Sequence, residues 1–238
     1  MNYLIFWHTS DSMNQEKRSM ETSLIEKTIA YVRLEMSGND ASHDWNHIDR
    51  VRKLAKFIAI HEGLNESQQL EAELSALLHD IKDWKYSGSE TAGAEASRDF
   101  LNENHVDPKV ISKVCYVISN IGFSKEIGGK PPITPGEPEG FKGDDVLLGV
   151  VQDADRLDAL GAIGIARCLT YGGAKNRVLY DPDLPPRDHL NEKEYKYGNS
   201  TTMNHFAEKL FKLKSKKLIS SYLKINISLK ISNLVYYF

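Results

Sequence analysis

The sequence has few cysteines and no long apolar run. Only two of its 238 residues are cysteine, Cys115 and Cys168, and they form no Cys-x-x-Cys pair. We therefore expect buried, unpaired thiols in a reducing compartment and assign the protein to the cytoplasm. No stretch approaches the ~20 apolar residues of a membrane span, and the first residues lack the basic start and cleavage site of a signal peptide. We expect no membrane partner.

The sequence also has no excess of positive charge. It has 30 Lys and Arg residues against 33 Asp and Glu residues, a net charge of −3. Such a balance supplies no overall field that would hold a polyanion, so we expect no nucleic-acid partner. Hydrophobic residues at 41% and charged residues at 26% are close to globular averages, which excludes a disordered chain.

Apolar residues recur at helical spacing along most of the chain, and this periodicity predicts an all-α fold. The predicted helices cover residues 21–36, 44–61, 67–81, 90–104, 108–121, 145–168 and 202–214. Residues 122–143 contain four of the eight prolines and six of the 16 glycines, a composition that cannot sustain a helix. We expect this segment and residues 172–200 to be long irregular loops.

Composition divides the chain into three parts. We expect an N-terminal extension over residues 1–20, one helical domain over 21–214 and an atypical tail over 215–238. The tail contains no acidic residue, and from Leu223 to Ile231 apolar and polar residues alternate. Alternation with a period of two is typical of a strand, so the tail is foreign to a helical fold.

Three separated helical pieces carry imidazole and carboxylate groups among apolar residues, at 42–51, 76–83 and 151–158. Burying the adjacent His79 and Asp80 behind Leu77 and Leu78 costs several kcal/mol unless a partner satisfies them, and a divalent cation satisfies both. Two nitrogens and two carboxylates suit Mn, Fe, Co, Ni or Mg, of which we favour Mn. The absence of thiolates argues against a structural zinc ion.

These pieces resemble the HD superfamily of metal-dependent phosphohydrolases, whose pattern is a His, a later His-Asp pair and a distant Asp. The resemblance covers roughly residues 23–214 and implies an HD-domain helical bundle. Carried over by position, it implies that His47, His79, Asp80 and Asp155 bind one divalent metal ion. The segment from Asp153 to Ala162 further resembles the small bacterial-type HD hydrolases.

Two neighbouring acids compete with Asp155 for the fourth metal position. Asp153 lies about 200° away around the helix, so both cannot face one ion. Asp158 lies one turn further on and is placed to orient a ligand imidazole. The resemblance implies that HD proteins with two irons need two further His ligands between the His-Asp pair and the final Asp. In this sequence only His105 lies between Asp80 and Asp155. We therefore favour one metal.

Two further residues are candidates for catalysis. Asp83 follows His79 and Asp80 at helical spacing, which predicts a position on the same face, where it can act as a general acid or base. The alternative is a solvated acid at a helix end. His43 precedes Asp44, a candidate N-cap, and is either close to the substrate phosphate or a surface histidine.

Basic side chains are the candidates for phosphate binding, although each is equally explained as a solvated charge. They are Arg50, Lys82, Lys175, Arg177 and Arg187. The resemblance implies a small-molecule phosphate substrate, most simply a nucleotide, cleaved by a triphosphate pyrophosphohydrolase or nucleotidase reaction. A non-catalytic ligand-binding or regulatory HD module is the alternative, an oxygenase is the third choice, and a homodimer is left open.

Overall fold

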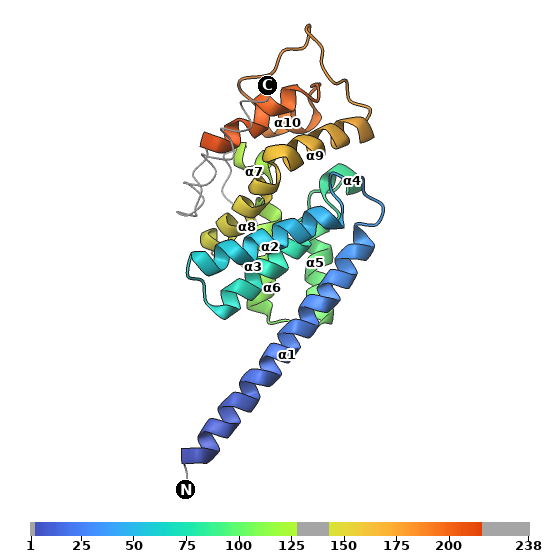
Figure 1. The fold of residues 1–238 in the computed structure, drawn as a ribbon. Helices are drawn as coiled ribbons and strands as arrows, with labels where there is room; N and C mark the ends of the chain where they lie inside the picture. The colour runs from blue at the N-terminus through green and yellow to red at the C-terminus, as the bar shows by residue number, and fades with distance from the viewer. Residues whose placement is uncertain (1–2, 128–142, 216–238) are drawn as a thin grey trace.

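The computed structural model describes residues 3–127 and 143–215, with side chains described over 15–127 and 143–213. Its elements are α1 (Tyr3–Glu35), α2 (Trp45–His61), α3 (Glu66–Leu78), α4 (Trp84–Ser87), α5 (Ala92–Glu103), α6 (Pro108–Asn120), α7 (Phe123–Ile127), α8 (Asp145–Asp158), α9 (Gly161–Ala174), α10 (Glu192–Tyr197), η1 (Phe206–Leu210) and η2 (Lys212–Ser215). This part of the chain contains no strand, which confirms the all-α prediction (Figure 1). The alternating run at 223–231 lies outside the described residues.

Helix α3 lies at the centre of the bundle and packs against α1, α2, α6 and α8. Its Ala72 and Ala76 face one apolar core, shared mainly with α2 and α8. Its Leu74, Leu77 and Leu78 face a second core, shared with α1, α5 and α6. Because both sides of α3 are buried, its C-terminal end is fixed between the two cores.

Local sequence signals begin three of the helices, two through polar caps and one through a proline. The Asp44 side chain accepts a hydrogen bond from the backbone N–H of His47 at the start of α2. Asn65 and Gln68 form a reciprocal capping box at the start of α3. Pro108 occupies the first turn of α6, where its missing N–H has no cost.

Helix α1 is longer than the predicted helix at 21–36, because it begins at Tyr3. Its C-terminal half is fixed by the buried Val32 and by Met36, which follows it. Figure 1 shows the N-terminal half projecting past the other helices. Residues 3–20 therefore continue α1 without a break, and the predicted domain boundary at residue 20 remains a prediction.

The predicted helix at 145–168 is wrong, because the chain forms two helices that meet after Asp158. Leu160 is extended, with φ −114° and ψ 163°, and Gly161 adopts φ +69°. Only glycine enters this left-handed region at little cost, so Gly161 turns the chain into α9. Asp155 and Asp158 consequently lie in the last turn of α8 rather than in mid-helix.

Four other segments differ from the prediction. Helix α3 ends at Leu78, not at residue 81. Residues 172–200 include the end of α9 and the short α10, which Asn191 caps. Residues 202–214 form the π-helical turn η1 and the 3₁₀ turn η2 in place of one α-helix. The predicted loop at 122–143 begins with α7, and residues 128–142 lie outside the described part.

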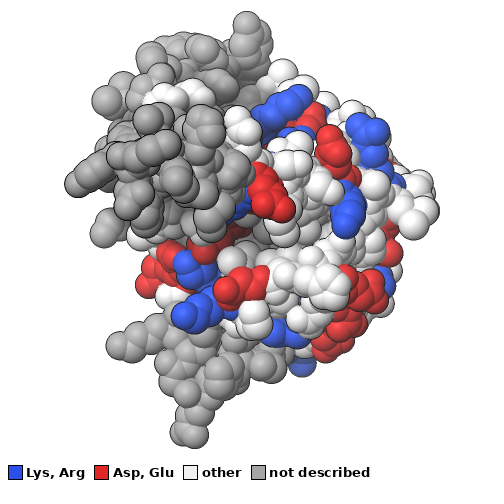
Figure 2. Space-filling view, turned by 90° about the horizontal axis from the view of Figure 1, so that it is seen from below, with Lys and Arg blue, Asp and Glu red and all other residues white. Residues whose placement is uncertain are grey.

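The described surface carries charges of both signs. Figure 2 shows Lys and Arg interspersed with Asp and Glu on the face seen from below. Among the helices that the structure describes, none combines the length and the apolar character that crossing a bilayer requires.

Candidate metal centre

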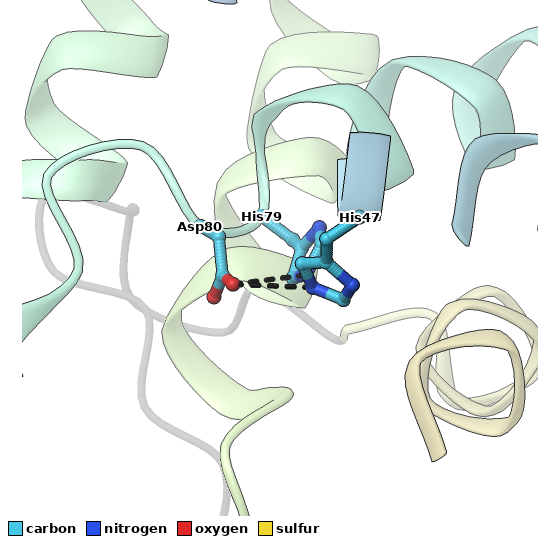
Figure 3. Close-up of side chains that lie close together, drawn as sticks. All are labelled: His47, His79 and Asp80. Carbon is cyan, nitrogen blue, oxygen red and sulfur yellow. Dashed lines mark ion pairs between the residues drawn. The ribbon is translucent and has the colours of Figure 1, made fainter. Parts of the chain in front are cut away.

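Four side chains from three parts of the bundle meet at the C-terminal end of α3. His47 comes from the first turn of α2, and its side chain is fully buried. His79 is the C-cap of α3, and Asp80 follows it in the turn. Asp155 comes from the last turn of α8. We call these four residues the ligand cluster, of which Figure 3 shows His47, His79 and Asp80.

The ligand atoms are spaced as around a single ion. Nε2 of His47 lies 3.3 Å from Oδ2 of Asp80 and 3.6 Å from Oδ1 of Asp155. Nε2 of His79 lies 3.6 Å and 3.9 Å from the same two oxygens. Ligand bonds of about 2.0–2.2 Å to a common centre separate neighbouring donors by roughly 3–4 Å. The cluster could therefore hold one divalent metal ion.

The two histidines present lone pairs to this centre. Nδ1 of His47 lies 2.8 Å from Oδ2 of Asp158, and Nδ1 of His79 lies 2.8 Å from the carbonyl oxygen of Ala76. Both oxygens are acceptors, so each Nδ1 carries a proton, and in the neutral form of each ring Nε2 carries a lone pair. Both Nε2 atoms are buried and have no hydrogen-bond partner among the described residues. A cation satisfies two such atoms at once, so the donor set fits a metal.

Electrostatics keeps the cluster acids ionised. Burial alone would raise the pKa of Asp80, but the nearby His79 and His47 hold it well below its usual range. Burial opposes ionisation of Asp155 too, and the same two histidines lower the pKa of its carboxyl. Burial would lower the pKa of His47, but hydrogen bonds to Asp158 and Asp80 outweigh it and raise that pKa. A divalent cation binds ionised carboxylates and neutral imidazoles, so it would take the place of the proton on each Nε2.

Asp158 supports the cluster from behind. Its carboxylate accepts the His47 hydrogen bond and two from Arg50, Nε to Oδ1 at 2.6 Å and Nη2 to Oδ2 at 3.0 Å. Nη1 of Arg167 lies 3.2 Å from Oδ2. Burial raises the pKa of Asp158, but His47 and the two arginines outweigh it and hold the pKa far below its usual value. The position of Asp158 therefore fixes the ring of His47.

The other acid and histidine weighed from the sequence lie elsewhere. The carboxylate of Asp153 is buried 3.8 Å from Nη1 of Arg156. His105 is exposed and lines a groove beside α1. Within the described ranges, His47, His79 and Asp80 are the only group of three or more metal-binding side chains whose ligand atoms all lie within 4.8 Å of one another. Asp155 joins this group through its Oδ1, which is close to both Nε2 atoms but outside that mutual distance limit.

Asp83 lies at the site, but not on the helix that the sequence predicts for it. The expectation of a continuing helix is wrong, since α3 ends at Leu78 and Lys82 adopts φ +48°. Asp83 is instead the N-cap of α4, and its Oδ1 accepts a hydrogen bond from the backbone N–H of Lys85. It nevertheless lines a small cavity, of about 110 Å³, together with Asp80 and Asp155. We call this the cluster cavity.

A larger cavity of about 450 Å³ adjoins the cluster cavity. Five residues line both cavities: Trp84, Lys85, Tyr195, Lys196 and Lys209. Its wall is rich in basic side chains, and we call it the basic cavity. Those basic side chains are Lys85, Arg167, Lys175, Arg177, Arg187, Lys196 and Lys209. An anionic ligand fits this wall.

The predicted phosphate contacts divide between the two cavities. Lys175 and Arg177 line the basic cavity, where Nζ of Lys175 lies 4.4 Å from the centre of the Tyr86 ring. Arg187 lines it too, but two hydrogen bonds of 2.9 Å tie its guanidinium to Glu208. Lys82 lines the cluster cavity and is 45% exposed.

The two remaining predicted residues, Arg50 and His43, form hydrogen bonds with neighbouring side chains. Arg50 holds Asp158, as described above. His43 lines the basic cavity, with Nδ1 2.7 Å from Oγ of Ser42 and Nε2 3.3 Å from Nζ of Lys85. Burial and the Lys85 ammonium hold the pKa of His43 well below its usual range, so the ring is neutral at neutral pH.

Sequence reasoning missed Lys85 and Arg167. Arg167 donates from Nε to the backbone oxygen of Ser42 at 2.7 Å and ties α9 to the turn before α2. It is the one basic residue in the otherwise apolar and small-residue segment 161–174, a signal that could have marked it. Lys85 follows Asp80 by five residues, and no motif distinguishes it from other lysines.

The chain is similar to known proteins in sequence and in fold. No family model matches the sequence. The uncharacterized protein YpgQ of Bacillus subtilis is 30% identical over 191 residues, which cover 79% of this chain and 87% of YpgQ. A YpgQ structure in complex with ADP gives a TM-score of 0.64, at 23% identity, over 92% of this chain and 93% of that chain.

Two other solved structures are similar over nearly the whole chain. A protein from Lactobacillus plantarum gives a TM-score of 0.73 at 29% identity, over 90% of this chain and 93% of its own. An HD-superfamily hydrolase from Bacillus thuringiensis gives 0.60 at 35% identity, over 91% of this chain and 95% of its own. At this identity and coverage, the chain belongs to the HD superfamily of hydrolases.

Proposed function

We propose that the protein hydrolyses a phosphate bond of a nucleotide with the help of one divalent metal ion, for which manganese is our first choice. The observation that carries the proposal is the position of the ligand cluster beside the basic cavity. The two cavities share lining residues, so a phosphate chain bound in the basic cavity can extend past these residues to the ligand cluster.

Each part of this site has a role in the proposed reaction. A divalent cation bound by the cluster supplies Lewis acidity, which stabilises charge on a phosphoryl group and lowers the pKa of water. Asp83 lines the same cavity and is placed to accept the proton of an attacking water. Lys175 and Arg177 offset phosphate charge.

The basic cavity also suits the nucleoside part of the substrate. Its volume of about 450 Å³ lies in the range of ordinary small-molecule sites. Aromatic rings of Trp84, Tyr195 and Tyr197 line it, and a base stacks favourably on such rings. The YpgQ structure contains ADP, a nucleotide of this size, which supports the proposal for a related chain.

A panel of nucleoside mono-, di- and triphosphates, followed by phosphorus NMR with Mn²⁺ and with a chelator, tests the proposal. We expect turnover with Mn²⁺ and none with the chelator. Release of pyrophosphate indicates a pyrophosphohydrolase, and release of phosphate indicates a nucleotidase. Binding of a nucleotide without turnover under either condition would contradict the proposal and favour a regulatory module.

A further inference from the structure

Lys85 lies where the two cavities meet. It belongs to the short helix α4, and its side chain is 25% exposed. Its Nζ lies 3.5 Å from Oδ1 of Asp83 and 3.3 Å from Nε2 of His43. Burial would lower the pKa of Lys85, but the carboxylates of Asp83 and Asp80 outweigh it and raise the pKa above its usual value. Lys85 is therefore a cation at neutral pH.

A directed chain of hydrogen bonds holds this ammonium. The hydroxyl of Ser42 donates to Asp40, which also accepts from the Tyr86 hydroxyl at 2.6 Å. Because the Ser42 hydroxyl hydrogen is used, its oxygen accepts from Nδ1 of His43. Nε2 of His43 then carries a lone pair, and it accepts from Lys85.

The other lysines shared by both cavities have different surroundings. Nζ of Lys196 lies 2.5 Å from Glu90 and 2.8 Å from Glu192, so two carboxylates neutralise it. Lys209 lies over the ring of Phe123, with Nζ 5.7 Å from the ring centre. An ammonium has three N–H donors, and the described contacts of Lys85 are one carboxylate and one neutral ring. Lys85 is therefore less neutralised than Lys196, and unlike Lys209 it is held by polar partners that orient its ammonium.

We propose that Lys85 binds the phosphate of the substrate that passes between the two cavities, and that Asp83 and His43 position it. The inference rests on the proposed function, since it assigns a phosphate contact within the same site. Both the backbone N–H and the ammonium of Lys85 contact Oδ1 of Asp83. Oδ2 of Asp83 is therefore left to accept the proton of the attacking water in the proposed reaction. His43 acts here through Lys85 as a positioning residue.

The test measures binding of α,β-methylene-ADP, which resists hydrolysis, by calorimetry with Mn²⁺ present. We expect Lys85→Met to weaken the affinity roughly 10- to 100-fold, the usual loss for a charge-assisted hydrogen bond. Lys113→Met is the matched control, because Lys113 is also a partly buried lysine paired with carboxylates, on α6 and away from both cavities. It should bind the probe as the wild type does.

A second pair of variants separates positioning from folding. His43→Gln keeps an acceptor for Lys85 and should retain most of the affinity, whereas His43→Leu removes the acceptor and should lose part of it. Equal affinities of Lys85→Met and wild type would overturn the inference, while nucleotide turnover by the wild type would leave the proposed function intact. Loss of bound manganese in Lys85→Met would also overturn it. Failure of the wild type both to bind the probe and to hydrolyse nucleotides would overturn the proposed function itself.

Discussion

At the level of single residues, the ring nitrogens of His47 and His79 are the strongest indication of a metal site. Each ring is fixed by an acceptor on Nδ1, and each presents a buried Nε2 that no described residue satisfies. A buried polar atom without a partner costs about 1–3 kcal/mol, so two of them facing one point need an explanation. A shared cation, which the geometry of the ligand cluster could hold, would supply that explanation.

Asp158 should control metal affinity without touching the metal. Asp158→Asn removes the charge that orients His47 and pairs with two arginines, and we expect metal binding to weaken roughly 10- to 100-fold. Asp153→Asn is the control, because Asp153 lies two residues before Asp155 on the same helix but pairs with Arg156. Titration with Mn²⁺ measures both. Unchanged affinity in Asp158→Asn would show that the ring of His47 is held by packing alone.

Asp83 should affect turnover far more than metal content. An asparagine at this position can still accept the hydrogen bond from the backbone N–H of Lys85 and cap α4. Asp83→Asn therefore removes the charge and leaves the cap, and we expect nucleotide turnover to fall about 100-fold or more. Elemental analysis of the same sample should find nearly the wild-type metal content. An equal loss of metal would make Asp83 a ligand.

At the level of elements, the turn that carries Asp80 depends on close packing against α5. A Cβ added at Gly93 would lie 2.6 Å from the carbonyl oxygen of Ile81, which is backbone and cannot rotate away. We expect Gly93→Ala to destabilise the fold by about 1–3 kcal/mol and lower the thermal midpoint by several degrees. Gly38→Ala is the control, since its Cβ would meet nothing within 4 Å. Similar midpoints for the two variants would contradict this account.

Glu90 links the segments that close the cluster cavity. Its carboxylate lies 2.5 Å from Lys125 of α7 and 2.5 Å from Lys196 of α10, and these lysines lower the pKa of Glu90 to about 2. The folded-state pKa is below the unfolded one, so the stabilisation is present above about pH 4.5 and is lost as the pH falls towards 2. Glu90 is 43% exposed, so solvent screening keeps the effect small.

Denaturation of Glu90→Gln and wild type at several pH values tests this link. The difference in unfolding free energy should be largest near neutral pH and should shrink as the pH falls from 4.5 towards 2. A difference that stays constant over this range would show that the carboxylate charge contributes nothing.

At the level of the whole molecule, the sequence predicts the bundle and its ligand types better than the turns between helices. Asp44 and Pro108 mark helix starts, because capping is a local interaction. The break at Gly161 was missed because Gly149 and Gly164 lie in the same apolar run and remain helical. Nothing in the local pattern distinguishes the glycine that turns the chain.

The candidate site divides in the same way. The His and Asp types at their spacing indicate a metal site, since such groups rarely lie among apolar residues. The roles of Lys85 and Arg167 depend on contacts with His43 and Asp158 that only the tertiary structure brings together. Arg50 and Arg187, expected to contact phosphate, face Asp158 and Glu208 for the same reason.

The most direct test of the account is the number of Mn²⁺ ions bound per chain, measured by calorimetric titration of wild type and of His79→Gln. The account predicts one site per chain in the wild type, because His47, His79, Asp80 and Asp155 converge on one centre. It predicts that this site is lost or greatly weakened in His79→Gln, while the protein still folds. No binding to the wild type, or equal binding to both proteins, would contradict it.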